Sequence, residues 1–249
     1  MIKEERRQER KRKKIGKIIL VIVIVFALLA LIVWKVFTVK NVEVSGNELY
    51  SDTQIQNSVL NDKYSWNTLY VFFKYKFKDT QVIPFVDSME ISMKIPHTIK
   101  IEVYEKGLLG YVTLESQKNQ YAYFDKDGLV VEVSKRKIED VPNVTGLSVE
   151  KVTANETLPV NNSLLKDLLN LTQTLKKYSI TPTKIKCKDN GRFVLKIGKI
   201  KVNFGDADNL ENKVLRLNEI LPQLDGYKGT LHMENYSEQT TDIVFEKSE

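Results

Sequence analysis

The feature that most constrains this chain is an unbroken apolar stretch near its start. Seventeen consecutive residues from Ile18 to Trp34 are apolar, and the stretch reaches Phe37 if the Lys35 ammonium turns toward the interface. About 20 helical residues span the ~30 Å hydrocarbon core of a bilayer. A cleaved signal peptide is the alternative, but the residues from Val33 to Phe37 are bulky where a signal peptidase needs small side chains. The sequence therefore predicts an uncleaved transmembrane helix over residues 18–37.

The charge on the two sides of this stretch predicts its orientation. Residues 1–17 contain nine Lys or Arg and three Glu, a net charge of +6 that equals the net charge of the whole 249-residue chain. By the positive-inside rule, residues 1–17 form a basic cytoplasmic tail and the rest lies outside, a single-pass type II arrangement in the cell membrane. The tail is also expected to contact anionic lipid. Because the remaining residues carry no net charge, no nucleic-acid-binding surface is predicted.

Residues 38–106 predict a small domain with the order strand, helix, helix, strand, strand. Residues 39–44 alternate and end in a turn, and Ser51 with Gln54 predicts a capping box for a helix over 52–61. Residues 86–94 and 98–104 alternate around Pro96 and predict a hairpin.

The aromatic-rich residues 64–77 predict the second helix, with its rings packed on the sheet. A second interpretation stays open. Some of the rings, interleaved with Lys74, Lys76 and Lys78, would sit at the level of the lipid head groups or bind a partner helix.

This domain resembles the polypeptide-transport-associated (POTRA) domain of the bacterial FtsQ/DivIB cell-division family, which follows a basic tail and one membrane span. The residues that carry the resemblance are Val42, Val44, Gly46, Asn47, Pro84, Pro96, Thr98, Ile99, Ile101, Val103 and Glu105. Two features depart from the family: Lys106 stands where Arg is frequent, and the aromatic run has no counterpart. The resemblance implies a β-α-α-β-β fold.

Residues 107–246 predict a second, β-rich domain, followed by a short tail at 247–249. Alternation predicts strands at 110–114, 120–124, 129–133, 184–188, 192–197, 200–204, 230–234 and 241–245. A leucine face at Leu164, Leu168, Leu171 and Leu175 predicts a helix over 163–178, and Asp208 with Glu211 predicts the cap of another. Both leucine faces are expected to cover the strands. The strings around Tyr123 and Val144 resemble the family's second domain, and the fold class expected is α+β.

The sequence contains none of the motifs typical of nucleotide-binding, zinc-dependent or serine-hydrolase enzymes. Two His and one Cys argue against a structural metal site, and no cofactor is expected. One enzymatic alternative is a sortase-like transpeptidase, because His97, Cys187 and Arg192 occur in the sortase order. Cys187 lacks the Thr-Leu-x-Thr-Cys approach of that family, so an idle thiol is expected. A small extracytoplasmic sensor or regulator is a further alternative.

Without catalytic residues, the expected function is binding. An unpaired sheet edge can take up a strand from another protein, and the last predicted strand is the candidate. The resemblance implies that this segment binds the coiled-coil division proteins FtsL and FtsB/DivIC, with a septal penicillin-binding protein as a further partner. The expected contact residues are Leu231, Met233, Tyr236, Thr241, Ile243 and Phe245. His232 and Glu234 replace the Asp and Arg frequent in the family, and an ordinary half-buried strand is the alternative for 241–245. The chain is thus expected to be a non-enzymatic scaffold at the division septum.

Overall fold

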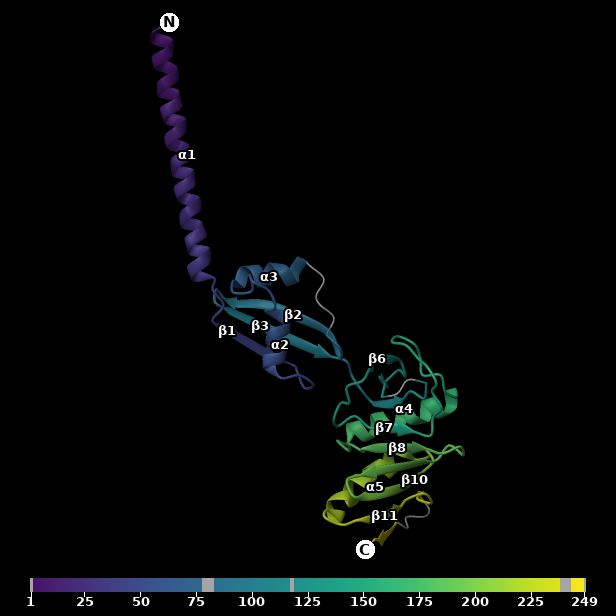
Figure 1. The fold of residues 1–249 in the computed structure, drawn as a ribbon. Helices are drawn as coiled ribbons and strands as arrows, with labels where there is room; N and C mark the ends of the chain where they lie inside the picture. Colours follow the sequence, from purple (N-terminus) through teal and green to yellow (C-terminus); the bar gives the residue numbers. More distant parts are fainter. Residues whose placement is uncertain (1, 78–82, 117–118, 238–242, 249) are drawn as a thin grey trace. The chain divides into compact units, whose positions relative to one another are not determined.

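The computed structural model describes residues 2–77, 83–116, 119–237 and 243–248 (Figure 1). The chain divides into two compact units, Met1–Glu105 and Lys106–Glu249. The first contains a long apolar helix and a three-stranded sheet with two helices, and the second contains a nine-stranded mixed sheet with helices. The predicted α+β class is confirmed.

The first unit begins with α1 (Ile2–Val36), in which residues Lys11–Val36 have a mean hydropathy of 3.2. This helix is long and apolar enough to cross a membrane. Ile18 and Trp34 lie within it, and Trp34 is 62% exposed. Phe37, the predicted end of the span, lies one residue beyond the helix, and its N–H still donates to the Val33 carbonyl at 3.3 Å.

The rest of the first unit has the predicted β-α-α-β-β order. Its elements are β1 (Asn41–Ser45), α2 (Asp52–Val59), α3 (Thr68–Phe77), β2 (Val86–Ile95) and β3 (Thr98–Glu105). The sheet order is β1-β3-β2, with β1 parallel and β2 antiparallel to the central β3. Apolar residues of the sheet and of both helices form the core, namely Ile55, Val59, Val71, Val86, Ile99, Ile101 and Val103.

Several residues of the POTRA resemblance have identifiable structural roles. Gly46 has φ 81°, and a Cβ there would lie 2.2 Å from the Val103 carbonyl oxygen, so only glycine fits beside β3. The Glu105 carboxylate accepts hydrogen bonds from the backbone N–H groups of Glu48 and Leu49. The predicted capping box at Ser51 is confirmed by both of its hydrogen bonds with Gln54.

The second unit is built on the nine-stranded sheet, whose order is β12-β11-β10-β9-β8-β7-β4-β5-β6. Its strands are β4 (Gly110–Thr113), β5 (Tyr121–Phe124), β6 (Val130–Ser134), β7 (Asn143–Thr145), β8 (Lys184–Cys187), β9 (Phe193–Ile197), β10 (Ile200–Gly205), β11 (Gly229–His232) and β12 (Val244–Lys247). The helices are α4 (Asn162–Lys177), α5 (Leu210–Ile220) and the short 3-10 helix η1 (Leu221–Leu224). Leucines of α4 and α5 share one core with the inward side chains of the strands. The expected covering role of both helices is confirmed.

The start of α5 differs from the prediction. Its N-cap residue is Asn209, in the left-handed region at φ 50°, and no side chain caps the helix. Glu211 instead accepts hydrogen bonds from Lys177 Nζ at 2.6 Å and from the Tyr178 hydroxyl at 2.7 Å. The capping box predicted at Asp208 is therefore wrong, because the Glu211 carboxylate forms a tertiary contact with the end of α4.

Candidate partner-binding edge

The nine-stranded sheet has two edge strands, β6 and β12, and the chain covers only one of them along the described residues. On the outer side of β6, the Val130 N–H donates to the Glu156 carbonyl at 2.8 Å and the Asn155 N–H donates to the Val130 carbonyl at 2.7 Å. Leu129 and Thr157 form an isolated bridge beside this pair. A loop thus covers the start of the β6 edge, which is one of the ways in which proteins protect an edge strand from unwanted pairing.

The β12 edge is open as far as the described residues are concerned. β12 pairs antiparallel with β11, with Leu231 opposite Phe245, and the Ser248 N–H donates to the Lys228 carbonyl at 2.9 Å. Hydrogen-bonded pairs alternate along an antiparallel ladder, so the backbone N–H and C=O groups of Val244 and Glu246 also face β11. The backbone N–H and C=O groups of Phe245 and Lys247 therefore point outward, and none of the described residues pairs with them.

Gly229 on β11 leaves room for the backbone and the Phe245 ring of β12. A Cβ on Gly229 would lie 2.3 Å from the Glu246 carbonyl oxygen and 2.7 Å from the Phe245 ring. Both distances are shorter than any real carbon contact, so a side chain at this position would displace β12. Gly229 thus fixes the distance between the last two strands.

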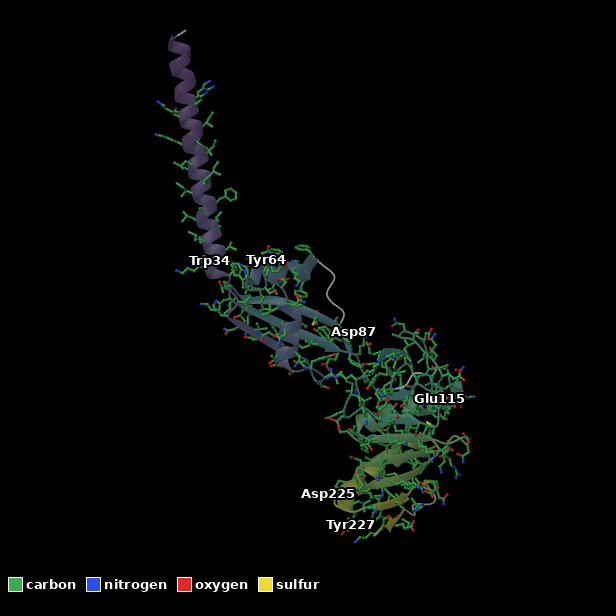
Figure 2. The ribbon with its side chains drawn as sticks, viewed as in Figure 1. Trp34, Tyr64, Asp87, Glu115, Asp225 and Tyr227 are labelled. Carbon is green, nitrogen blue, oxygen red and sulfur yellow. The ribbon has the colours of Figure 1, made fainter. Side chains whose placement is uncertain are left out.

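The two faces of β12 differ in chemistry. Phe245 is half-buried against the core, and its ring meets the ring of Tyr227 edge-on with centroids 6.4 Å apart. Tyr227 is labelled in Figure 2. Val244, on the other face, is 60% exposed. Ile243 precedes the strand and packs partly on the core. A strand added beside β12 would meet outward backbone groups, with the Phe245 ring as an apolar contact.

Charged groups join β11 to β12 on the exposed face. His232 Nδ1 lies 2.9 Å from Glu234 Oε1, and His232 Nε2 lies 3.5 Å from Glu246 Oε2 on β12. The Asn203 amide on β10 also contacts Nδ1 at 3.3 Å. The hydrogen bond to Glu234, with a smaller contribution from Glu246, raises the pKa of His232 above its ordinary value. The replacements at positions 232 and 234 noted in the sequence thus form one local ion-pair network.

Comparison with known proteins assigns the second unit to a family. The family model described as "FtsQ/DivIB, C-terminal related" matches residues 113–238, half of the chain. The chain belongs to the FtsQ/DivIB family. The cell division protein DivIB of Clostridium acetobutylicum is 29% identical over 118 residues, which make up 47% of this chain and 42% of that relative. The similarity thus spans less than half of the relative's length, and β12 lies beyond the family match.

The structure brings some of the six expected contact residues together and separates others. Leu231 and Met233 are buried in the core, 1% and 0% exposed, so their side chains hold β11 in place. Tyr236 is half-buried in the segment after β11, and its N–H donates to the Met233 carbonyl at 3.0 Å. Phe245 lies in β12, Ile243 just before it, and Thr241 outside the described residues. The accessible candidates are therefore Tyr236, Ile243 and Phe245.

Cys187, the nucleophile of the sortase alternative, does not lie in the environment that a reactive thiol requires. Cys187 is 2% exposed on the core side of β8, and burial raises its pKa to about 12. A thiol with such a pKa stays protonated near neutral pH and is a poor nucleophile. His97 lies at the β2–β3 turn of the first unit, whereas Arg192 follows the β8–β9 turn.

Sequence reasoning missed two residues that shape the edge. Gly229 was not singled out, although a glycine at the start of a strand can mark close backbone approach. Glu246, which directly follows the last predicted strand at 241–245, contacts His232 from the neighbouring strand. No sequence signal could have predicted the contact between Glu246 and His232, because it depends on the β11–β12 register.

Proposed function

We propose that this protein is a non-enzymatic membrane scaffold of the bacterial division complex. In this proposal α1 anchors the chain in the cell membrane with its N-terminus in the cytoplasm, and the two folded units lie outside at the division septum. Membership of the FtsQ/DivIB family and the similarity to a cell division protein support the role in division. The apolar α1 and the basic residues before it support the topology.

The observation that carries the binding role is the open edge of β12. We infer that it takes up a strand from a coiled-coil division protein of the FtsL or FtsB/DivIC type, by β-strand addition. The outward backbone groups of Phe245 and Lys247 would provide the hydrogen bonds. Half-buried Phe245 and Tyr236 would provide side-chain selectivity. A septal penicillin-binding protein is a further partner that such an assembly would recruit.

Co-purification tests the docking site. The full chain is expected to capture FtsL with its FtsB/DivIC-type partner, and Phe245→Glu and Tyr236→Ala are expected to abolish or strongly weaken that capture. Leu215→Glu is the matched control, because Leu215 is 42% exposed and belongs to α5 rather than to the last two strands. Undiminished capture by both edge variants would refute docking at β12.

The role in division has a separate test in cells. Depletion of the protein is expected to give filaments without septa, whereas a sensor or an envelope transpeptidase would leave septation intact. Replacement of Cys187 by Ser provides the second arm. If the Cys187→Ser chain folds but fails to complement depletion, the enzymatic alternative with Cys187 as nucleophile replaces the scaffold.

A further inference from the structure

The first unit carries a group of exposed aromatic side chains beside the end of α1. The Val39 N–H donates to the Trp66 carbonyl at 2.8 Å, and the Thr68 N–H donates to the Phe37 carbonyl at 2.7 Å. The Asn67 side-chain amide donates to the Val33 carbonyl within the last turn of α1, at 3.2 Å. Asn67 and Thr68 are buried, so these bonds fasten the start of α3 to the point where the chain leaves the apolar helix.

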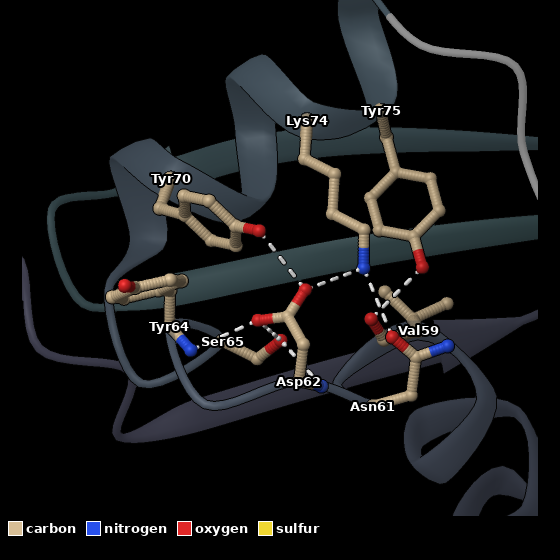
Figure 3. Close-up of polar contacts among 8 residues, drawn as sticks. All are labelled: Val59, Asn61, Asp62, Tyr64, Ser65, Tyr70, Lys74 and Tyr75. Carbon is tan, nitrogen blue, oxygen red and sulfur yellow. Dashed lines mark hydrogen bonds and ion pairs between the residues drawn. The ribbon is translucent and has the colours of Figure 1, made fainter.

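The aromatic residues of this region fall into two groups. Tyr70 and Tyr75 are half-buried and donate hydrogen bonds to Asp62 at 3.0 Å and to the Val59 carbonyl at 2.9 Å (Figure 3). Trp66, Phe73 and Phe77 are 43%, 49% and 73% exposed, and the rings of Phe73 and Phe77 stack with centroids 5.9 Å apart. Tyr70 and Tyr75 thus hold α3 on its unit, whereas Trp66, Phe73 and Phe77 face solvent. Tyr64 is also exposed, and Phe72 is half-buried.

The lysines of this region also differ, since one is held in an ion pair and two lie beside aromatic rings. Lys74 is bound to Asp62 at 2.8 Å, and this bond holds the pKa of Asp62 well below its ordinary value (Figure 3). Lys63 lies 4.7 Å from the Tyr64 ring centroid and Lys76 lies 5.3 Å from that of Phe72. Neither lysine has an ion pair among the described residues, and residues 63–77 contain no Asp or Glu. The exposed rings thus lie beside two lysines that form no ion pair within the described part of the chain.

We propose that Trp66, Phe73 and Phe77, together with Lys63 and Lys76, form an interfacial surface that contacts the anionic head groups of the membrane that α1 enters. Tryptophan and other aromatic rings favour the head-group region, where an apolar ring and polar surroundings are both accommodated. Lysines beside them are attracted to anionic lipid. We choose a lipid surface as the occupant because hydrogen bonds from Asn67 and Thr68 join the start of α3 to the C-terminal end of the apolar helix α1.

This surface is distinct from the partner-binding edge, since it lies in the first unit and involves no residue of β12. The interfacial surface would also fix the orientation of the first unit. With α1 in the bilayer and this surface on the head groups, the first unit would be held against the membrane at two places.

The tryptophan content of the chain allows a direct test, because Trp34 and Trp66 are its only tryptophans. The Trp34→Phe chain, inserted in vesicles of phosphatidylcholine and phosphatidylglycerol, reports on Trp66 alone. When the lipids carry bromine close to the head group, Trp66 fluorescence is expected to be quenched. The Trp66→Phe chain, which keeps Trp34 in α1, shows by its own quenching that the protein has inserted.

Tyr104→Trp, in a chain that also carries Trp34→Phe and Trp66→Phe, is the negative control. Tyr104 is 43% exposed and lies six residues along β3 from Thr98, roughly 20 Å at about 3.3 Å per residue. We expect no quenching there. Charge reversal by Lys63→Glu with Lys76→Glu is expected to reduce the quenching of Trp66 in anionic vesicles and to leave Trp34 unchanged.

Unquenched Trp66 in vesicles in which Trp34 is quenched would overturn the proposal and favour a protein partner for these rings. Equal quenching of Trp66 and of the Tyr104→Trp control chain would also overturn the proposal, because the contact with lipid would then be unspecific. Neither outcome bears on capture of the division partners by β12, which is measured separately.

Discussion

The two edges of the nine-stranded sheet differ in how their backbone groups are used. At β6 the segment around Asn155 and Glu156 supplies hydrogen bonds to the outer side of Val130. At β12 the outer groups of Phe245 and Lys247 have no such cover among the described residues. An open edge invites uncontrolled pairing, and β12 limits this by being four residues long and by carrying Glu246 and Lys247. Within the described parts of the chain, the fold thus covers the start of one edge of this sheet and not the other.

The largest effect is expected from separating β12 from β11. Gly229→Val places a side chain where the Glu246 carbonyl and the Phe245 ring now lie, so β12 must leave its position. We expect loss of partner capture in co-purification, with the β6 edge unaffected. Gly107→Ala is the control, because a Cβ at Gly107 meets no atom within 4 Å. Full capture by a correctly folded Gly229→Val chain would contradict the assignment of the site to β12.

A loss of stability without damage to the edge is expected from Asp206→Ala. Lys213 is 2% exposed in α5, and its Nζ donates to Asp206 Oδ1 at 2.7 Å. Removing the carboxylate leaves a buried cation with one backbone acceptor, a cost of about 2–3 kcal/mol in the free energy of unfolding. Lys213→Met, which removes the charge and retains the volume, should cost less. Denaturant unfolding measures both, and capture per folded molecule should stay unchanged.

The same pair has a predictable pH dependence. The hydrogen bond from Lys213 lowers the pKa of Asp206. A lowered folded-state pKa adds stability above the ordinary carboxyl value of about 3.9, and this stability is lost as pH falls through the lowered pKa. The Asp206→Ala chain should therefore lose less stability on acidification than the parent. An identical acid dependence of the two chains would show that the pair is not formed.

A smaller effect is expected at the covered edge. Asn155 has φ 69°, a conformation that costs an alanine about 1 kcal/mol and that glycine adopts freely. Asn155→Ala should thus lower the free energy of unfolding by about that amount, and Asn155→Gly should be close to neutral. Partner capture should be unchanged by either variant. Impaired capture would place the partner at the β6 edge.

The smallest effect is expected from the titration of His232. Its pKa is raised, so its ion pairs stabilise the β11–β12 contact fully below the ordinary histidine value of about 6.5 and lose this effect as pH rises through the raised value. The groups that face the ring are Glu234, Glu246 and Asn203. Amide exchange in β12, corrected for intrinsic rates, should accelerate over this range, and His232→Gln should remove the acceleration.

The order of the elements could be predicted from the sequence because hydrophobic periodicity encodes it. Alternation predicted the β2–β3 hairpin, and the leucine spacing predicted α4, although the buried face includes Leu165 and leaves Leu164 only partly buried. The last strand was predicted at 241–245 and lies at Val244–Lys247. Its register is set by pairing with β11 and by the space at Gly229, and alternation alone does not contain that information.

The site was less predictable than the fold, because burial decides which residues are accessible. Leu231 and Met233 share the strand pattern of the other candidates, yet both lie in the core. Lys213 is buried in α5, and its burial depends on the contact with Asp206 in the segment between β10 and α5, which the helical pattern does not contain. The aromatic run 64–77 also has no periodicity that could separate the structural tyrosines from the exposed Phe73 and Phe77.

The docking site at β12 is tested most directly by residue-resolved amide hydrogen exchange of the full chain, alone and bound to the proposed FtsL and FtsB/DivIC-type partner. We expect the outward amides of Phe245 and Lys247 to exchange rapidly in the free chain and to become protected on binding, while those of β6 do not change. Unchanged exchange in β12 with a stably bound partner would contradict strand addition at this edge.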